Sequence, residues 1–452
     1  MLELWFDFSC PYAYLASRRV RHLAVEVDWR PMLLGGVFRG TGAGDGSMTG
    51  ISPQKQAHNL ADMHRWADLF GEPFRLPAAH PMRTVQALRT LLGVARPWWP
   101  AAIEAIFAAY WQHGDDITQR QVIAHVLRAA GVPDAEVTSA IQRADDPAIK
   151  DELRQRTDEA ISLGIFGAPA WVMRGRGEPR LIWGQDRMAW VEAMLAGWQL
   201  AGPPPGGPRP FAPRERAIAG KTLDVYFDVS SAFAYFGLTQ VSALAAIGVR
   251  PRLVPILLGG LYRDIQQVNV PWFAMPPAKQ RYVGLDMERW ASWWGQPFDQ
   301  PRKFPQRTIT AQRLNLIAAE TDFETGVRVA IALGRAMWAE QRDLEDDETL
   351  RAILSSLDLP KGVPEEWLAR TRDPQVKAAL VANTTAAREA GVFGVPTFIV
   401  DGKHLFWGQD RLELVARALA GWTPPEAPLG GPPRSGDQPH GSGGGLPVGA
   451  PA

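Results

Sequence analysis

The chain repeats itself, in order and at nearly constant spacing. The pentapeptide Trp-Gly-Gln-Asp-Arg stands at Trp183–Arg187 and again at Trp407–Arg411, 224 residues later. Other repeated groups keep the same order, with the small changes in spacing that surface-loop insertions produce: Phe6-Asp7 and Phe227-Asp228, Gly35-Gly36 and Gly259-Gly260, Lys55 and Lys279, Asp62-Met63 and Asp286-Met287, Arg65-Trp66 and Arg289-Trp290, Arg83-Thr84 and Arg307-Thr308, and Gly164–Pro169 and Gly391–Pro396. Such self-similarity indicates two diverged copies of one unit.

Two stretches rich in proline and glycine divide the chain. At 452 residues it exceeds one ordinary domain. Residues 201–221 hold so much proline and glycine that they cannot pack as helix or strand, which predicts a semi-extended linker. Residues 423–452 are dominated by proline, glycine and serine, which predicts a disordered tail. We therefore expect a first domain at 1–200 and a second at 222–422, called here the first and second copy.

The composition excludes several classes of partner. The 48 basic residues balance the 48 acidic ones, so no net charge draws the chain to nucleic acid or to an anionic membrane. No apolar run approaches the roughly 18 residues of a spanning helix, and Met1–Asp7 lacks the features of a signal peptide, so we expect a cytoplasmic protein. Cys10 is the single cysteine, which excludes an internal disulfide, and the eight histidines show no ligand spacing, so we expect no metal.

Each copy shows the same order of expected elements. A short apolar strand, a helix and a second strand precede a long stretch with amphipathic helical spacing, and two short strands and a final helix follow it. This order predicts a thioredoxin-like α/β unit interrupted by a helical insert. The expected strands are 2–8, 27–34, 170–173 and 181–183, then 223–229, 252–258, 397–400 and 405–407; the expected first helices are 12–23 and 233–247, and the expected inserts are 55–160 and 279–390.

The first candidate position is the turn between the first strand and the first helix, where Cys10 and Ser231 occupy matching places. Both fall where a helix begins, with free backbone N–H groups and the positive end of the helix dipole facing them. A thiolate there has a lowered pKa, whether it belongs to the protein or to a bound thiol, and a serine there can donate a hydrogen bond to such a thiolate. The alternative is that Ser231 is only a helix N-cap and Cys10 only a small buried residue.

The second candidate is the Gly-x-Phe-Gly-x-Pro turn that ends at Pro169 and at Pro396. A proline that opens a strand is confined to edges or special turns. If the peptide bond before it is cis, the preceding residue, Ala168 or Val395, is left with free N–H and C=O groups that can pair with an extended peptide. The alternative is an ordinary tight turn without a ligand.

The third candidate is the repeated Trp-Gly-Gln-Asp-Arg at the start of the last helix. Its Gln185-Asp186 and Gln409-Asp410 pairs are expected at a helix N-terminus, where a carboxylate caps N–H groups or binds the α-ammonium of a substrate. Lys55 and Lys279 are a fourth feature, each one turn into the helical insert. A lone lysine is most often a solvated surface charge, so these two indicate chemistry only together with other support.

Taken together, these residues resemble those of the 2-hydroxychromene-2-carboxylate isomerases and kappa-class glutathione transferases, a branch of the DsbA-like thioredoxin superfamily. The opening motif of that family is similar to Phe-Asp-x-x-Ser-Pro-Tyr-x-Tyr-Leu, and it matches Phe6–Leu15 and Phe227–Phe236 here. The resemblance covers about residues 2–198 and 222–421. It implies an α/β protein of two thioredoxin-like (DsbA-like) domains, each with a helical insertion, and glutathione as the cofactor.

The resemblance implies a nearly complete glutathione site in the second copy. Ser231 matches the catalytic serine, which hydrogen-bonds the glutathione thiolate. Asn269 matches the asparagine that holds the glutathione backbone, and Lys279 matches a lysine near the glycyl end. Val395, before Pro396, matches the residue whose backbone pairs with the cysteinyl part. Gln409-Asp410 matches the pair that binds the γ-glutamyl end. Ala232 replaces the family's proline and Phe233 its tyrosine, which predicts a looser turn.

The first copy departs from the family pattern at two positions. It keeps Pro11, Tyr12, Lys55, Ala168-Pro169 and Gln185-Asp186. Cys10 replaces the serine, and Gly46–Gly50 stands where the second copy has Asn269. Cys10 also aligns with the nucleophile of the DsbA-like Cys-x-x-Cys motif, but Ala13 occupies the resolving position, which excludes a dithiol oxidant. A monothiol that forms a mixed disulfide with glutathione stays open.

Three hypotheses of function follow. The leading one is a glutathione-dependent isomerase or transferase that acts on an unsaturated aromatic oxo-acid or similar electrophile, with Ser231 and the helix N-terminus stabilising the bound thiolate. Aromatic residues such as Trp272, Phe273 and Trp290 would shape the pocket for this small-molecule substrate, unless they belong to the core. The second hypothesis is a monothiol oxidoreductase that uses Cys10. The third is that one copy is only structural; family members pair as homodimers, so the tandem chain would form an intramolecular pseudo-dimer.

Overall fold

The computed structural model describes residues 1–44, 51–175 and 177–425. The elements of the first copy are β1 (Leu2–Phe6), α1 (Pro11–Val20), β2 (Val27–Pro31), α2 (Leu34–Thr41), α3 (Pro53–Phe70), α4 (Val85–Gly93), η1 (Arg96–Trp98), α5 (Trp99–Ala108), η2 (Ala109–His113), α6 (Arg120–Ala129), α7 (Asp134–Arg143), α8 (Pro147–Ser162), β3 (Ala170–Met173), β4 (Arg180–Trp183), η3 (Gln185–Arg187) and α9 (Met188–Leu195). The expected succession of strands, helical insert and strands is confirmed.

The second copy repeats this succession. Its elements are β5 (Leu223–Phe227), α10 (Ala232–Leu238), α11 (Val241–Ala246), β6 (Arg252–Pro255), α12 (Leu258–Asp264), α13 (Pro271–Ala274), α14 (Pro277–Trp294), α15 (Ile309–Thr321), α16 (Phe323–Trp338), α17 (Asp347–Ser355), α18 (Val363–Arg370), α19 (Pro374–Glu389), β7 (Thr397–Val400), β8 (His404–Trp407), η4 (Gln409–Arg411) and α20 (Leu412–Leu419).

Each copy builds one four-stranded mixed sheet. The strand order is β2-β1-β3-β4 in the first copy and β6-β5-β7-β8 in the second. The first strand pairs in parallel with the second and antiparallel with the third, so that Leu4 lies opposite both Trp29 and Trp171. Every residue of β1 is buried, as expected for the central strand of a sheet that is covered on both faces. The predicted α/β fold with two thioredoxin-like units is confirmed.

Several expected elements differ in extent from those observed, among them the second strands, which end at Pro31 and Pro255. The first strands are shorter than predicted, because the chain turns after Phe6 and Phe227. The helix predicted over 233–247 is divided into α10 and α11. The division falls beside Gln240, whose Oε1 accepts a hydrogen bond of 2.8 Å from the backbone N–H of Phe211 in the linker.

The linker lies along the second copy. It contains neither helix nor strand, as its proline and glycine content predicts. Its backbone N–H groups at Arg209 and Ile218 donate to the carbonyl groups of Trp293 and Leu419 at 2.6 and 2.9 Å. Most of the predicted tail, residues 426–452, lies outside the described residues.

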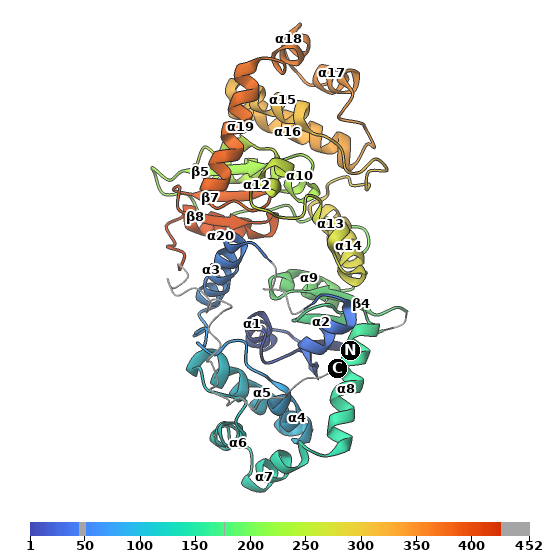
Figure 1. Cartoon of the computed structure of the whole chain (residues 1–452), viewed down its shortest axis with the longest axis vertical. Coiled ribbons are helices and arrows are strands. Elements are labelled where there is room, and N and C mark those ends of the chain that lie inside the picture. The colour runs from blue at the N-terminus through green and yellow to red at the C-terminus, as the bar shows by residue number, and fades with distance from the viewer. Residues whose placement is uncertain (45–50, 176, 426–452) are drawn as a thin grey trace, which may run out of the picture.

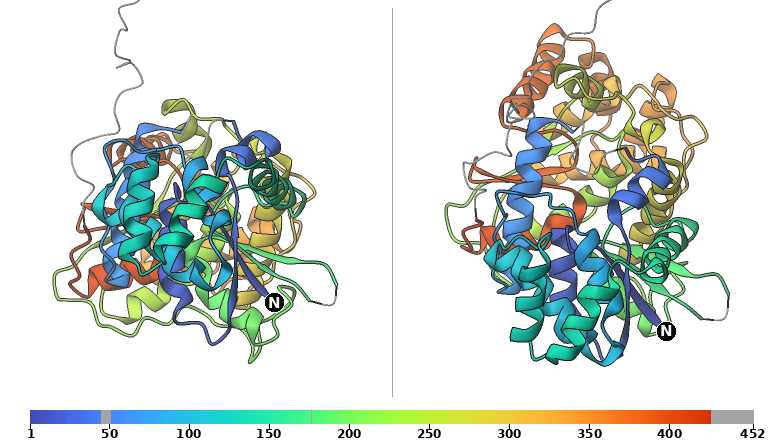
Figure 2. Two further views of the ribbon diagram at one scale, coloured as in Figure 1. Left: turned by 90° about the horizontal axis from the view of Figure 1, so that it is seen from below. Right: turned by 60° about the horizontal axis from the view of Figure 1, so that its bottom comes forward.

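The two copies are stacked along the long axis of the molecule. Figure 1 shows the outer helices of the two inserts, α4–α7 and α15–α18, at opposite ends. Figure 2 brings the first copy forward and shows its insert helices standing side by side in front of the sheet. Between the copies, α3 packs against β8. None of the described helices is both long and apolar enough to cross a membrane.

Candidate active site

A buried carboxylate fixes the turn that precedes α10. Asp228 Oδ1 accepts from the backbone N–H of Ser230 at 2.9 Å and from the Thr308 hydroxyl at 2.8 Å. Its Oδ2 accepts from the backbone N–H of Leu258, the first residue of α12, at 2.9 Å. Burial raises the pKa of the Asp228 carboxyl. The same set of bonds surrounds Asp7 in the first copy, so the two turns share one framework.

Ser231 caps α10 and still has a proton to donate. Its Oγ accepts from the backbone N–H of Ala234 at 3.3 Å, so the N-cap interpretation is correct. Its O–H donates to the backbone oxygen of Val395 at 3.4 Å, which is long for a hydroxyl donor. A serine has two acceptor lone pairs besides its proton, so capping leaves the O–H free to turn to a better acceptor.

Cys10 occupies the same place but behaves differently. Its side chain is only 7% exposed, and it makes no capping hydrogen bond to α1. The thiol donates to the backbone oxygen of Ala168 at 3.1 Å. Burial raises the pKa of the Cys10 thiol to about 12, although the N–H groups of Ala13 and Tyr12 act to lower it. The predicted low pKa is therefore wrong for this cysteine, because the loss of water outweighs the helix N-terminus.

Both proline turns have the predicted cis peptide bond, at Ala168-Pro169 and at Val395-Pro396. The expected free carbonyl is not found, because the oxygens of Ala168 and Val395 accept from Cys10 and Ser231. The expected free N–H is found, since neither residue donates to another group in the described part of the chain. One backbone donor beside each turn is thus left without a partner among the described residues.

Helix α10 brings three of the second copy's predicted residues together, namely Ser231, Pro396 and Gln409. A side-chain carbon at Gly237 would lie 3.1 Å from Pro396 and 3.6 Å from Gln409, so this helix packs directly against both. Ser231 begins the same helix. Asn269, exposed between α12 and α13, places its Oδ1 3.1 Å from the position of a Cβ at Gly259, near the start of α12. Its counterpart in the first copy, residues 46–50, lies outside the described residues.

The Asp of each Gln-Asp pair binds an arginine of the other copy. Asp186 Oδ2 accepts from Arg411 Nη1 at 2.7 Å, and Asp410 Oδ2 accepts from Arg187 Nη2 at 2.8 Å. Neither Gln-Asp pair caps the short helix that holds it, so the capping prediction is wrong. The reason is that a charge-assisted bond to a guanidinium is stronger than a cap to a neutral N–H.

The insert helix of each copy also covers the last strand of the other. The Lys55 ammonium lies 4.9 Å from the centre of the Trp407 ring, and the Trp407 backbone N–H donates to His58 Nε2 at 3.2 Å. The reciprocal bond runs from the Trp183 backbone N–H to the Tyr282 hydroxyl at 2.9 Å. Lys55, which the sequence assigns to the first copy's site, therefore contacts the second copy.

Lys55 and Lys279 are not solvated surface charges. Burial lowers the pKa of both, and that of Lys55 falls to about 8 because the Lys279 charge adds to the effect. Within the described residues, neither ammonium forms an ion pair or a hydrogen bond. Two partly buried cations without a counter-charge are poised to receive an anion.

A buried acid differs between the copies. The Asp62 carboxylate accepts hydrogen bonds from Arg411 Nε and Nη2 at 2.8 and 3.0 Å and from the Tyr12 hydroxyl at 3.2 Å. Although burial acts to raise the pKa of Asp62, the charge of Arg411 lowers it. Its counterpart Asp286 lies 3.8 Å from the nearest arginine nitrogen, and its Oδ1 has no partner in the described residues. Burial raises the pKa of Asp286 to about 6.

Sequence reasoning missed this cluster as part of the site, although its signal was present. Asp62, Asp286 and the two arginines are all retained in both copies at equal spacing. Of the two alternatives for the aromatic residues, Trp290 belongs to the core, because its ring packs 4.8 Å from that of Trp190 and is buried. Phe273, in contrast, is 63% exposed. No described group of three or more His, Cys, Asp or Glu is arranged to hold a metal ion.

The comparison with known families agrees with the observed architecture. Residues 1–196 and 222–420 each match the family model described as the DSBA-like thioredoxin domain. The chain belongs to this family. The duplication predicted from the sequence is thereby confirmed, since one family model matches twice.

Individual relatives each match about half of this DSBA-like chain. Glutathione S-transferase kappa 1 of Rattus norvegicus is 29% identical over 45% of this chain and 94% of its own length. The 2-hydroxychromene-2-carboxylate isomerase of Pseudomonas putida is 30% identical over 44% of this chain and 93% of its own length. A solved structure of a 2-hydroxychromene-2-carboxylate isomerase superposes with a TM-score of 0.39 at 25% identity, over 44% of this chain and 94% of that one.

Proposed function

We propose that the protein is a glutathione-dependent isomerase or transferase that acts on an unsaturated aromatic oxo-acid or similar electrophile. Its relatives carry the names of two such enzymes, which supports the reaction class. The single observation that carries the proposal is the hydroxyl of Ser231, which caps α10 and keeps a proton beside the free N–H of Val395. We assign the principal site to the second copy on this ground.

The residues present fit glutathione. Lys279 and Lys55 are partly buried ammonium groups that lack a counter-charge among the described residues, as expected for a site that takes a carboxylate. The N–H of Val395, before Pro396, suits a peptide carbonyl, and Asn269 lies beside the start of α12. Asp410, beside Gln409, would accept an ammonium group in addition to its bond from Arg187. In the first copy, Lys55, Ala168-Pro169 and Gln185-Asp186 would serve in the same way, with Cys10 in place of the serine.

Glutathione, when bound, supplies a thiolate nucleophile. Ser231 would donate its O–H to the sulfur, and the N-terminus of α10 would add the positive end of its dipole. Preorganised donors of this kind are worth about 10²–10³ in rate per donor in other enzymes. Asn269, Lys279 and Gln409-Asp410 would hold the tripeptide so that its sulfur meets the electrophile.

We further propose that the two copies form an intramolecular pseudo-dimer, with domains at 1–200 and 222–422 joined by the linker at 201–221. The support is the reciprocity of the contacts. Arg65 donates to the Leu405 carbonyl at 2.6 Å, and its counterpart Arg289 donates to the Leu181 carbonyl at 2.9 Å. Paired contacts of this kind are the mark of an isologous interface. A cytoplasmic location is still a prediction from the sequence.

The alternative monothiol function has less support. A thiol must be ionised and accessible to exchange with a disulfide. Cys10 is buried, its thiol donates a hydrogen bond to the backbone oxygen of Ala168, and burial raises its pKa. We therefore give Cys10 the role of a hydrogen-bond donor inside the first turn.

The test combines binding with turnover. Calorimetry with glutathione on the native chain and on Lys279→Ala and Lys55→Ala measures affinity and stoichiometry, and conjugation of 1-chloro-2,4-dinitrobenzene measures thiolate reactivity. We expect binding to weaken in both lysine variants. We expect Ser231→Ala to lose about 10²-fold or more in kcat, while Cys10→Ser retains turnover. A chain that binds no glutathione, or a Ser231→Ala variant with native turnover, would refute the proposal.

A further inference from the structure

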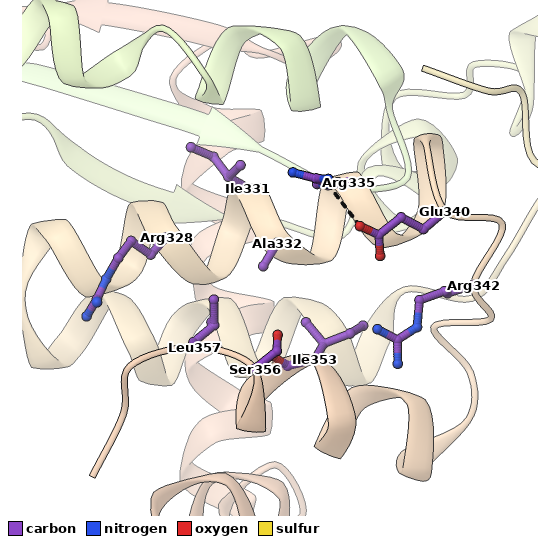
Figure 3. Close-up of a pocket in the computed structure, with 9 residues that line it drawn as sticks. All are labelled: Arg328, Ile331, Ala332, Arg335, Glu340, Arg342, Ile353, Ser356 and Leu357. Atoms are coloured by element: carbon purple, nitrogen blue, oxygen red, sulfur yellow. Dashed lines mark hydrogen bonds and ion pairs between the residues drawn. The ribbon is translucent and has the colours of Figure 1, made fainter. Parts of the chain in front are cut away.

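The outer side of the second insert carries a groove remote from the cluster between the copies. It lies between α16 and α17 and encloses about 380 Å³. Small-molecule sites usually enclose roughly 300–1,000 Å³, so the groove has the size for a small ligand. Its lining residues are Arg328, Ile331, Ala332, Arg335, Glu340, Arg342, Ile353, Ser356 and Leu357, shown in Figure 3.

The groove has an apolar middle and a cationic group at each end. Its apolar lining is formed by Ile331 and Ala332 of α16 together with Ile353 and Leu357, and Figure 3 shows Ala332 on the side of α16 toward the latter two. Arg328 lies at one end and Arg342 at the other.

These two arginines are held by neutral groups rather than by ion pairs, although Asp322 at the start of α16 acts electrostatically on Arg328. The Arg328 guanidinium donates to the Thr325 hydroxyl at 3.2 Å, and that of Arg342 donates to the Thr349 carbonyl at 3.3 Å. Neither forms an ion pair with any residue in the described ranges. The third arginine of the lining, Arg335, is already paired with Glu340 at 2.9 Å. Three arginines and one glutamate leave the groove with an excess of positive charge.

The first copy has the same groove without this charge. A concavity of about 340 Å³ lies between α5 and α6. The two grooves are equivalent because Trp111 in η2 and Trp338 at the end of α16 occupy matching places. The indole N–H of each donates at 2.8 Å to a backbone oxygen, that of Phe8 or Val229, at the first turn of its copy. By this alignment, Arg335 replaces Ala108 and Arg342 replaces Asp115.

We propose that the second copy's groove binds a small organic anion with an apolar body, such as an aromatic carboxylate. The apolar middle would cover the body of the ligand, and Arg328 or Arg342 would take its carboxylate in the bidentate manner that guanidinium groups favour. Charge is the argument for this class, since the matching groove of the first copy has Asp115 where the second copy has Arg342 and no arginine in its lining.

The groove lies on the helix that also supports the Ser231 turn. A side-chain carbon at Gly334 of α16 would come within 2.8 Å of the Tyr235 ring of α10, so the two helices are in direct contact. The Trp338 indole N–H, four residues on, holds the backbone oxygen of Val229. The groove is nevertheless lined by none of the proposed glutathione-site residues, and the inference does not rest on the proposed function.

The probe for the test is 2-naphthoate, with the neutral 2-naphthalenemethanol as its uncharged analogue. Titration calorimetry on the full chain is done with saturating glutathione present, so that any site filled by glutathione is closed. We expect one naphthoate bound per chain and at least tenfold weaker binding of the alcohol. We expect Arg328→Gln combined with Arg342→Gln to weaken naphthoate binding at least tenfold. The matched control is Arg351→Gln, an exposed arginine of α17 outside the lining, which should bind as the native chain does.

A second variant tests the location by shape. Ser356→Trp places a bulky ring on the exposed edge of the groove and should abolish binding, while thermal unfolding checks that the variant is folded. Introducing the two cations into the first copy at the matching positions, with Ala101→Arg and Asp115→Arg, should raise the stoichiometry toward two. Native affinity in the double glutamine variant, or equal binding of the alcohol, would overturn the proposal.

Discussion

Arg411 of the second copy holds both carboxylate oxygens of Asp62 in the first, through Nε at 2.8 Å and Nη2 at 3.0 Å. Both side chains are largely withdrawn from water, with 13% and 2% exposed. The same guanidinium donates to Asp186 at 2.7 Å. One arginine therefore joins two acids of the first copy to the end of the second copy's sheet.

Removing this arginine should destabilise the whole chain. We expect Arg411→Ala to lower the free energy of unfolding by about 3–5 kcal/mol, because Asp62 would be left as a buried, unpaired charge. Denaturant unfolding followed by circular dichroism measures the change. The control is Arg370→Ala, which removes an exposed pair with Glu320 and should cost less than about 1 kcal/mol. Equal effects of the two substitutions would contradict the structure.

The raised pKa of Asp286 should make stability depend on pH. The folded chain takes up this proton at about pH 6, whereas the unfolded chain does so near the ordinary value of 3.8. Between these values the folded state binds more protons, so this group's contribution to the free energy of unfolding falls as pH rises from about 4 to 6. Arg187, Arg289, Asp186 and Asp410 act on the same carboxyl. Comparing unfolding of the native chain and of Asp286→Asn across this window isolates the slope, which the variant should lack.

One hydroxyl that binds Asp62 has no counterpart in the second copy. Tyr12 donates to Asp62, and Phe233 occupies the matching position in the second copy. We expect Phe233→Tyr to lower the pKa of Asp286 and flatten its slope. Tyr12→Phe should instead remove a donor from Asp62 and weaken stability. The pH dependence of unfolding for both variants measures this, and a slope unaltered by Phe233→Tyr would show that the hydroxyl does not reach Asp286.

Glutathione affinity should fall at alkaline pH. The Lys55 ammonium loses its proton at about pH 8, well below the usual 10.5, so its charge is present at neutral pH and absent above. We expect the affinity for S-methylglutathione, which has no thiol to titrate, to weaken as pH rises through 8. The conservative variant Lys55→Arg keeps its charge and should bind independently of pH over this range. A native profile that is flat from pH 7 to 9 would remove Lys55 from the site.

Cys10 should react slowly with alkylating reagents. With a pKa of about 12, roughly one thiol in 10⁴ is ionised at pH 8. We expect iodoacetamide to modify the native chain at least 10²-fold more slowly than the chain unfolded in urea, as followed by mass spectrometry. Rapid modification of the native chain would reinstate the monothiol hypothesis.

The fold could be predicted from the sequence because its signals are local. The spacing of apolar residues around Leu2–Phe6 and in the inserts indicates strands and helices without knowledge of their neighbours. The repeat then gives every element a second, independent occurrence. Ser231 and Pro396 were likewise predictable as turn positions, because residue type and place at an element boundary carry the information.

The electrostatics could not be predicted, because they depend on packing between distant segments. The pKa of Cys10 follows from its burial against Ala168, which lies 158 residues away. Asp186 is expected at a helix start on local grounds, yet its carboxylate is taken by Arg411, which only the packing of the two copies brings near. The repeated spacing of these residues in the two copies indicates that they matter, but it does not indicate which residue each of them binds.

The linker that joins the two copies has a consequence for how their shared contact surface can change. In a pair of identical subunits, every substitution is made twice, once on each side of the symmetry axis, so a favourable change in one half-site is imposed on the other. In this chain the two sides are encoded separately. Cys10 can face Ala168 while Ser231 faces Val395, and Tyr12 can serve Asp62 while Phe233 leaves Asp286 without such a donor. Because the two copies are fused in one chain, each copy can therefore change without a matching change in the other.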